Sequence, residues 1–239
     1  MAKNNFEILL ETDDFVAINK PSGLLTIPDR EQSEKSLKEM LIDKYTQIFT
    51  VHRIDKDTSG LVIFARNENT HRYLSGLFTE RKIEKIYLGI VLGKPDNSSG
   101  TIIANIGENP AHKGLMNVHR NGKHAHTDYE VIDSNANFSL LSFKLHTGRT
   151  HQIRVHAKEI GHPLACDPLY GDGKPVLLSN LKKKFKLSKH DEAERPMIGR
   201  LALHAYQLNF ETSAGELIKL EAPIPKTFRA LMIQLKKLS

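Results

Sequence analysis

The apolar run at residues 61–65 constrains the fold more than any other stretch, because it directly follows a short polar loop. Its composition, Leu-Val-Ile-Phe-Ala, favours a strand buried on both faces over a helix. Residues 58–60, Thr-Ser-Gly, supply turn chemistry immediately before it. We therefore expect Asp55 to lie on a loop at the edge of a sheet. The residues alone leave two roles for Asp55, a reactive carboxylate or a turn residue that hydrogen-bonds its own backbone.

Apolar periodicity predicts further elements on both sides of this strand. Strands are expected at residues 15–20, 86–92, 128–132 and 141–145. Helices are expected at residues 35–49, around Leu74, Leu77 and Phe78, at 150–160 with Thr150 as the cap and Gly161 as the stop, and at 227–237. Runs of strands separated by helices, without strict alternation, predict an α+β fold with a mixed sheet.

The length of 239 residues is enough for one large domain, and the sequence has no internal repeat and no obvious linker before residues 171–199. We expect one domain over residues 1–239 and a monomer. The single cysteine, Cys166, cannot form an intramolecular disulfide, which indicates a reducing compartment. No apolar run approaches the roughly 20 residues of a membrane span. These features predict a cytoplasmic protein that does not enter a membrane.

The net charge of +6 indicates a polyanionic partner, because surplus Lys and Arg commonly neutralise phosphate. The surplus is concentrated in a basic insert at about residues 171–199. Within it, Lys182, Lys183, Lys184, Lys186 and Lys189 form a cluster. This insert is either a phosphate-contacting arm or a solvated surface loop.

A second polar block, residues 145–156, contains two arginines and three histidines where a strand is expected to pass into a helix. Such a junction offers cations and backbone N–H groups to an anion. A metal site would draw on His52, Asp55, His151 and His156. His151 and His156 are five residues apart and share neither a helix face nor a strand face well, so we expect no metal there.

Other reaction classes lack their motifs. No Gly-x-Ser-x-Gly elbow is present, and Cys166 has no neighbouring base in the sequence and fits a packing role. Neither glycine-rich phosphate motif occurs, so ATP and dinucleotides are not implied. We expect no nucleotide cofactor.

Six motifs in order resemble the RluA family of RNA pseudouridine synthases. The signature His-Arg-Ile-Asp-x-x-Thr-Ser-Gly stands at residues 52–60, and the others stand at residues 19–24, 85–87, 147–156, 161–163 and 203–205. Together they cover about residues 8–225. The resemblance implies the pseudouridine synthase catalytic fold, with a central mixed, mostly antiparallel sheet, flanking helices and an active-site cleft.

The resemblance also implies an isomerase that converts specific uridines to pseudouridine in structured rRNA or tRNA without a cofactor. Asp55 would be the catalytic carboxylate, acting on ribose C1′, on the uracil ring, or through a glycal intermediate. Tyr87 would stack on the flipped base, and Arg154 would pair with Asp55. Arg53 would enter the RNA stack where the uridine leaves.

Further residues are implied as RNA-facing or structural support: Lys20, His52, Arg149, His151 and His204, with Lys182, Lys183 and Lys184 as phosphate contacts. Two departures from the family stand out. Cys166 occupies a position that is usually glycine, and we expect no separate N-terminal RNA-binding domain, so the catalytic domain itself must recognise RNA. Two alternatives remain: an inactive RNA-binding or ribosome-assembly protein of the same fold, and a metal-dependent nuclease or phosphodiesterase.

Overall fold

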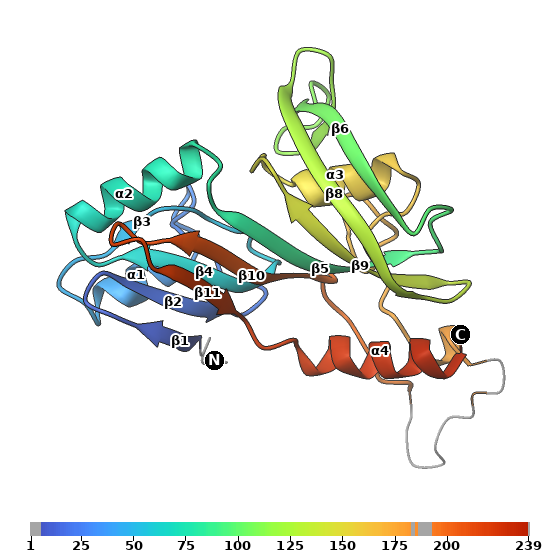
Figure 1. Cartoon of the computed structure of the whole chain (residues 1–239). Helices are drawn as coiled ribbons and strands as arrows, with labels where there is room; N and C mark the ends of the chain where they lie inside the picture. Colours follow the sequence, from blue (N-terminus) through green and yellow to red (C-terminus); the bar gives the residue numbers. More distant parts are fainter. Residues whose placement is uncertain (1–5, 183–184, 186–192, 239) are drawn as a thin grey trace. The chain divides into compact units, whose positions relative to one another are not determined.

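The computed structural model describes residues 6–182, 185 and 193–238. Its contacts divide the chain into two compact units, one within residues 1–87 and 204–223 and the other within 88–203 and 224–239. The helices and strands are labelled in Figure 1. Four α-helices combine with parallel and antiparallel strand pairs in the described residues, which confirms the α+β class and the mixed sheet.

Six strands belong to the first unit, in the order β1-β2-β4-β10, with β3 also on β4 and β11 on β10. Their bounds are β1 Glu7–Glu11, β2 Phe15–Lys20, β3 Phe49–Thr50, β4 Ser59–Ala65, β10 Leu203–Glu211 and β11 Leu217–Glu221. Among the described residues of these six strands, β4 and β10 pair in parallel and the other pairs are antiparallel. Every residue of β4 is buried, which confirms the predicted two-sided burial.

Two helices, α1 (Leu37–Ile42) and α2 (Glu68–Thr79), cover opposite faces of this sheet. Successive residues of a strand point to opposite faces. Val62 and Phe64 of β4 share a core cluster with α1, whereas Leu61 and Ile63 share one with α2. The strand that follows the Asp55 loop is thus fixed from both sides.

The helix predicted over residues 35–49 is shorter than expected. Ser36 caps α1 through a capping box with Glu39, and the helix ends at Ile42. Beyond it the backbone turns, with the N–H of Tyr45 bonded to the carbonyl of Leu41. Tyr45 and the downstream Ile48 remain buried in the same cluster. Apolar spacing therefore marked buried residues correctly but overstated the length of the helix.

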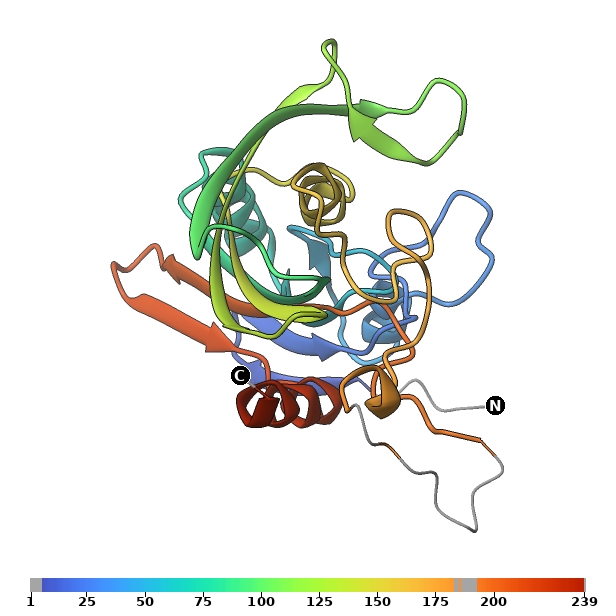
Figure 2. The same cartoon turned by 90° about the vertical axis from the view of Figure 1, so that its right-hand side faces the viewer.

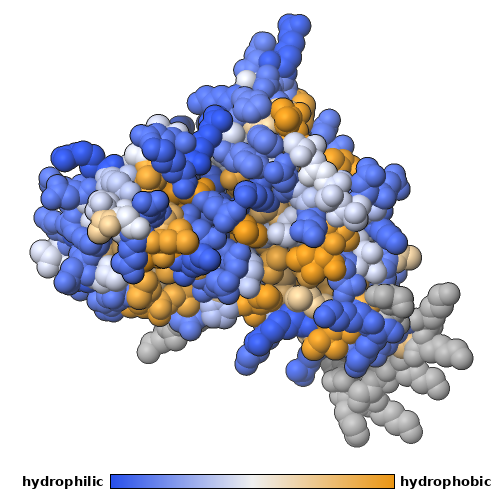
Figure 3. Space-filling view, viewed as in Figure 1, coloured by the Kyte–Doolittle hydropathy of each residue, from blue (hydrophilic) through white to orange (hydrophobic). Residues whose placement is uncertain are grey.

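The second unit contains the antiparallel order β9-β8-β6-β7. The bounds are β6 Ser99–Glu108, β7 Met116–Val118, β8 Lys123–Ser134 and β9 Phe138–Leu145; β5 (Glu84–Leu92) starts in the first unit and continues here. The strands predicted at 128–132 and 141–145 are confirmed and are longer than expected. Residues at the loop end of the β6–β8 hairpin are mainly hydrophilic and exposed (Figure 3, top).

Helix α3 (Gln152–Glu159) packs within the curve of β6 and β8, as Figure 2 shows. The predicted Thr150 cap was wrong. The N-cap is His151, whose backbone is left-handed with a φ of 55°. Instead, the Gln152 Oε1 atom accepts hydrogen bonds from the Thr147 hydroxyl at 2.7 Å and the Arg149 N–H at 3.0 Å. Gly161, with a φ of 80°, follows the helix end as predicted.

The C-terminal helix α4 (Lys226–Leu238) buries Phe228, Leu231 and Leu235, as its spacing predicted. A 3-10 helix at Leu178–Asn180 lies in the basic insert. Across the described residues, no helix is both long enough and apolar enough to span a membrane.

Candidate active site

The loop that carries Asp55 is pinned by the segment after β2. Three of its backbone carbonyls accept hydrogen bonds from residues 20–26: Ile54 from Thr26 Oγ1 at 2.8 Å, Lys56 from the Gly23 N–H and Lys20 Nζ at 2.9 Å each, and Asp57 from Ser22 Oγ at 2.6 Å. A loop held at three anchor points keeps a precise backbone path. This arrangement explains structurally why the motifs at residues 19–24 and 52–60 occur together.

Lys20 is completely buried, and its ammonium group completes this anchor. Besides Lys56, it donates to the carbonyl oxygens of Pro21 at 2.9 Å and Leu24 at 2.7 Å. A buried ammonium is costly unless its N–H groups are hydrogen-bonded, and three carbonyls meet that need. Of the two roles expected for Lys20, RNA contact or structural support, this burial favours structural support through the position of the Asp55 loop.

Asp55 lies in a tight turn that its own carbonyl closes by accepting the Thr58 N–H at 3.2 Å. Its side chain is half-buried, between the buried Ile54 and the exposed Lys56. Arg53, two residues earlier, is exposed. Asp55 is thus a turn residue and also a carboxylate that remains partly accessible, so the turn role does not exclude a reactive one.

The far end of the loop requires a glycine. Gly60 has a φ of 111°, and a Cβ built on it would lie 2.2 Å from the Ala205 carbonyl oxygen. Here β4 runs parallel to β10, with Ser59 beside His204 and Gly60 beside Ala205. The buried Ser59 hydroxyl and His204 Nδ1 lie 2.9 Å apart in a hydrogen bond. The motif at residues 203–205 therefore supports the second end of the Asp55 loop.

Tyr87 lies on β5 and packs against the core cluster that contains Ile54. Burial raises the pKa of its hydroxyl group well above the ordinary value, and the negative charge of Asp55 raises it further. The phenol therefore stays protonated at neutral pH. The structure brings Tyr87 and Asp55 into electrostatic reach within the first unit, as expected for residues of one site.

His52 has a structural environment. Its Nε2 atom accepts the Ile63 N–H at 3.0 Å, and its ring stacks on Phe78 at a centroid distance of 4.5 Å. Burial, assisted by the charge of Lys85, lowers the pKa of His52 to about 3, so the ring is neutral. These contacts tie the start of the loop to β4 and α2, and of the two roles expected for His52 they favour structural support.

Arg154 is buried on α3, and its partner is one that the sequence analysis missed. Its Nε and one terminal nitrogen bond to the two carboxylate oxygens of Asp167 at 2.8 and 2.7 Å. Asp167 Oδ1 also accepts the N–H groups of Leu169 and Tyr170. The Arg154 guanidinium carbon lies 4.9 Å from the centre of the Tyr170 ring. The sequence signal for this pair was that Asp167 directly follows Cys166, which stands at a position that is usually glycine. The pairing of Arg154 with Asp55 stays a prediction.

Cys166 takes a backbone conformation that glycine favours. It is buried with a φ of 58°, in the left-handed region that glycine favours, and its thiol donates to the Ile198 carbonyl at 3.3 Å. Asp167 directly follows, so the turn that Cys166 completes also places the carboxylate for Arg154.

The remaining residues that were predicted as RNA contacts or structural support differ in their exposure. Arg149 is half-buried and donates to the His124 carbonyl at 2.9 Å. His151 bonds the Tyr170 hydroxyl at 2.8 Å, so it supports the Arg154 surroundings. Lys182 is exposed. Lys183 and Lys184 lie outside the described residues, as do Lys186 and Lys189.

Comparison with known proteins gives consistent matches. The sequence profile described as RNA pseudouridylate synthase matches residues 14–159. The chain is 36% identical to ribosomal large subunit pseudouridine synthase D of Nitrosomonas europaea and 34% identical to the RNA pseudouridine synthase YlyB of Bacillus subtilis, over 97% and 98% of its own length. It spans 66% and 74% of those relatives.

Two human structures are similar in fold. RNA pseudouridylate synthase domain containing 4 matches with a TM-score of 0.73 at 27% identity, over 96% of this chain and 92% of that one. RNA pseudouridylate synthase domain containing 1 matches with a TM-score of 0.71 at 27% identity, over 93% and 84%.

Proposed function

Because the chain belongs to the RluA-type RNA pseudouridylate synthase family, we propose that it isomerises uridine to pseudouridine in structured RNA, with Asp55 as the catalytic carboxylate. One observation carries the assignment of the site: Asp55 lies on a loop pinned through the carbonyls of Ile54, Lys56 and Asp57, in electrostatic reach of a protonated Tyr87. A carboxylate fixed in this way is suited to attack at one defined atom.

The reaction rearranges bonds within one nucleotide. The bond from uracil N1 to ribose C1′ breaks, and a bond from C5 to C1′ forms, while the C5 proton leaves and N1 gains one. Nothing is oxidised or reduced, so a carboxylate and a shaped site suffice. Asp55 would act on C1′, on the ring, or by removing a sugar proton. All three routes require an ionised carboxylate that the substrate can reach.

Base flipping is the access step that we propose. A target uridine inside a structured RNA must leave its stack to meet Asp55, at a cost of a few kcal/mol. The half-buried Tyr87 ring offers a flat face for the extruded base, and the exposed Arg53 is close enough in sequence to enter the vacated position. Arg154, held by Asp167, would orient Asp55.

Large-subunit ribosomal RNA is the substrate that we favour, with tRNA as the second choice. Relatives at 36% and 34% identity carry the name ribosomal large subunit pseudouridine synthase D. The net charge of +6 suits a polyanion. We further propose that Lys182 to Lys184 and Arg149 contact phosphates.

The decisive experiment compares Asp55→Asn with Asp57→Asn in the same loop. Tritium release from RNA labelled at uracil C5 measures turnover, and filter binding measures affinity. We expect Asp55→Asn to lose turnover to below detection while binding the RNA, because the substitution keeps size but removes charge. Asp57→Asn should keep most activity, since only its carbonyl anchors the loop. Full turnover by Asp55→Asn would refute the mechanism. A wild-type protein that binds ribosomal RNA without turnover would favour the inactive RNA-binding alternative.

The basic insert has its own test. Replacing Lys182, Lys183 and Lys184 by Gln should weaken RNA binding and reduce the slope of log affinity against log salt by about 0.9 for each lost phosphate contact. An unchanged slope would identify the insert as ordinary surface.

A further inference from the structure

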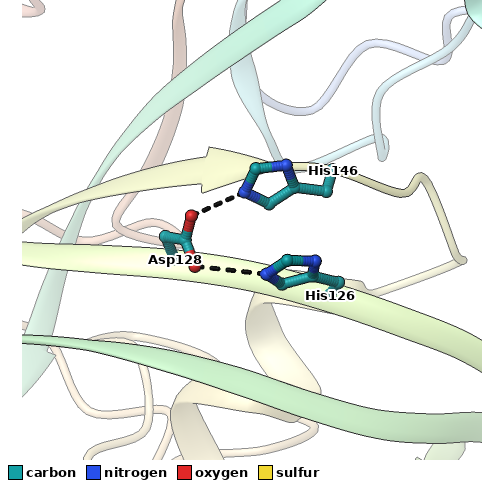
Figure 4. A group of neighbouring side chains, drawn as sticks. All are labelled: His126, Asp128 and His146. Carbon is teal, nitrogen blue, oxygen red and sulfur yellow. Dashed lines mark hydrogen bonds and ion pairs between the residues drawn. The ribbon is translucent and has the colours of Figure 1, made fainter.

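Two histidines and an aspartate converge on the outer face of the β8–β9 hairpin, away from the Asp55 loop in sequence. His126 and Asp128 lie on β8, and His146 directly follows β9. Figure 4 shows both imidazole rings directed at the Asp128 carboxylate. One ligand atom from each of the three residues lies within 4.8 Å of the others. The sequence analysis considered other histidines and missed this group, because its members come from two strands.

Strand geometry explains the convergence. Residues 126 and 128 are two apart, so they share one face of β8, and the intervening Thr127 is buried on the other. Thr127 pairs with Leu145 across the hairpin, and the His146 N–H bonds the His126 carbonyl at 3.2 Å. The two imidazoles therefore stack, with ring centres 4.0 Å apart. Pairing between the two sides of the hairpin therefore fixes the backbone positions of His126, Asp128 and His146.

The carboxylate is prepared to act as a ligand. Asp128 accepts from His146 Nε2 at 2.6 Å and His126 Nε2 at 3.2 Å, and the Thr101 hydroxyl of β6 donates to it at 2.7 Å. Thr101 orients the carboxylate as outer partners orient metal ligands.

We propose that His126, Asp128 and His146 form a binding site for a divalent transition-metal ion of the Zn²⁺ type. Imidazole nitrogens with one carboxylate suit Zn²⁺, Ni²⁺ and Cu²⁺, whereas Mg²⁺ and Ca²⁺ require oxygen ligands. Zinc binds at about 2.0–2.1 Å from nitrogen, which places tetrahedral ligand atoms about 3.3 Å apart. The two Nε2 atoms lie 2.6 and 3.2 Å from different oxygens of Asp128, both closer than this spacing, and a bound ion would replace these two hydrogen bonds.

Three protein ligands leave a fourth position for water. Each half-buried side chain is about one-third exposed, so an ion reaches the group from solvent. Lys144 pairs with Asp128 in the strand register and shares its face, so it is the cation that a metal must outcompete. The site ties β8 to the chain that leads into α3. It lies beyond the proposed isomerase function and takes no part in that reaction.

Isothermal titration of the full chain with Zn²⁺ tests the site, with thermal unfolding as a second readout. We expect saturable binding of one ion and a higher Tm, because the ion binds the folded chain. His146→Ala and Asp128→Asn should each weaken binding at least tenfold. His112→Ala, an exposed histidine in the same unit, should bind as the wild type does. Circular dichroism confirms that each variant is folded.

Co²⁺ substitution distinguishes this site from binding by other histidines. The wild type should give the visible absorption of a low-coordinate nitrogen and oxygen site, and the double variant His126→Ala, His146→Ala should not. Absence of saturable Zn²⁺ binding by the wild type, or equal binding by the double variant, would overturn the proposal. Pseudouridine formation with and without chelator is measured separately, and we expect no change, so failure of the metal site would leave the proposed function intact.

Discussion

The Lys20 ammonium donates a hydrogen bond of 2.9 Å to the Lys56 carbonyl, and this bond joins the end of β2 to the loop that carries Asp55. Lys20→Met keeps the length of the side chain but removes the ammonium donor from the carbonyls of Pro21, Leu24 and Lys56, of which Lys56 keeps the Gly23 N–H. We expect the free energy of unfolding to fall by about 3 kcal/mol, in line with hydrogen bonds to charged groups, and kcat to fall more than RNA affinity.

Lys56→Met is the matched control, because that side chain is exposed and pairs with Glu34. It should change stability by less than about 1 kcal/mol. Chemical denaturation measures both variants. Equal stability of Lys20→Met and the wild type would show that the anchor is unimportant.

Gly60→Ala tests the close approach of β4 and β10. An added Cβ would meet the Ala205 carbonyl, and the φ of 111° is unfavourable for alanine. We expect a loss of about 3 kcal/mol from strain and displacement. Gly76→Ala on α2 meets nothing within 4 Å and should instead stabilise the protein by about 0.5–1 kcal/mol. Thermal and denaturant unfolding separate the two, and a loss at Gly76 equal to that at Gly60 would contradict the explanation.

Variants of the buried pair of Arg154 and Asp167 can distinguish a structural role of Arg154 from a catalytic one. Asp167→Asn should cost about 3 kcal/mol, because it removes the charge that neutralises Arg154. Asparagine retains an oxygen for the N–H groups of Leu169 and Tyr170. Combining it with Arg154→Met should recover most stability, since neither charge of this buried pair remains.

If Arg154 orients Asp55 as proposed, that double variant regains stability but not turnover. Recovery of both would show that Arg154 serves the fold alone. Unfolding curves and tritium release on the same preparations give the two readouts.

His52 predicts a pH dependence of stability. Its folded pKa, about 3, is below the ordinary 6.5, so the unfolded chain binds a proton between these values and the folded chain does not. Stability from His52 is therefore complete above pH 6.5 and is lost as the pH falls toward 3, by at most about 1.4 kcal/mol per pH unit. His52→Gln keeps an acceptor for the Ile63 N–H and should flatten the stability profile between pH 4 and 6.

His112→Gln, at an exposed position, should leave that profile unchanged. Denaturant titrations at several pH values provide the measurement. A slope in His52→Gln that matches the wild type would refute the assignment.

Apolar pattern alone predicted β2 to the residue, the buried β4, and the apolar face of α4. These elements are predictable because the order of apolar residues along the chain indicates whether one or both faces of an element are buried. The apolar pattern did not predict β6, a strand on which Ile103 is exposed. It also overstated the length of α1, which a turn ends early.

The sequence by itself determined the family, the α+β class and the identity of the Asp55 loop, because contiguous motifs and apolar runs are local properties of the chain. Only the tertiary structure decided what each motif residue does. It buried Lys20 under the Lys56 carbonyl, 36 residues away, gave Arg154 its partner Asp167, and gathered His126, Asp128 and His146 from two strands. Hydrogen bonds and charge pairs between distant residues depend on how strands align, and spacing along the chain does not specify that alignment.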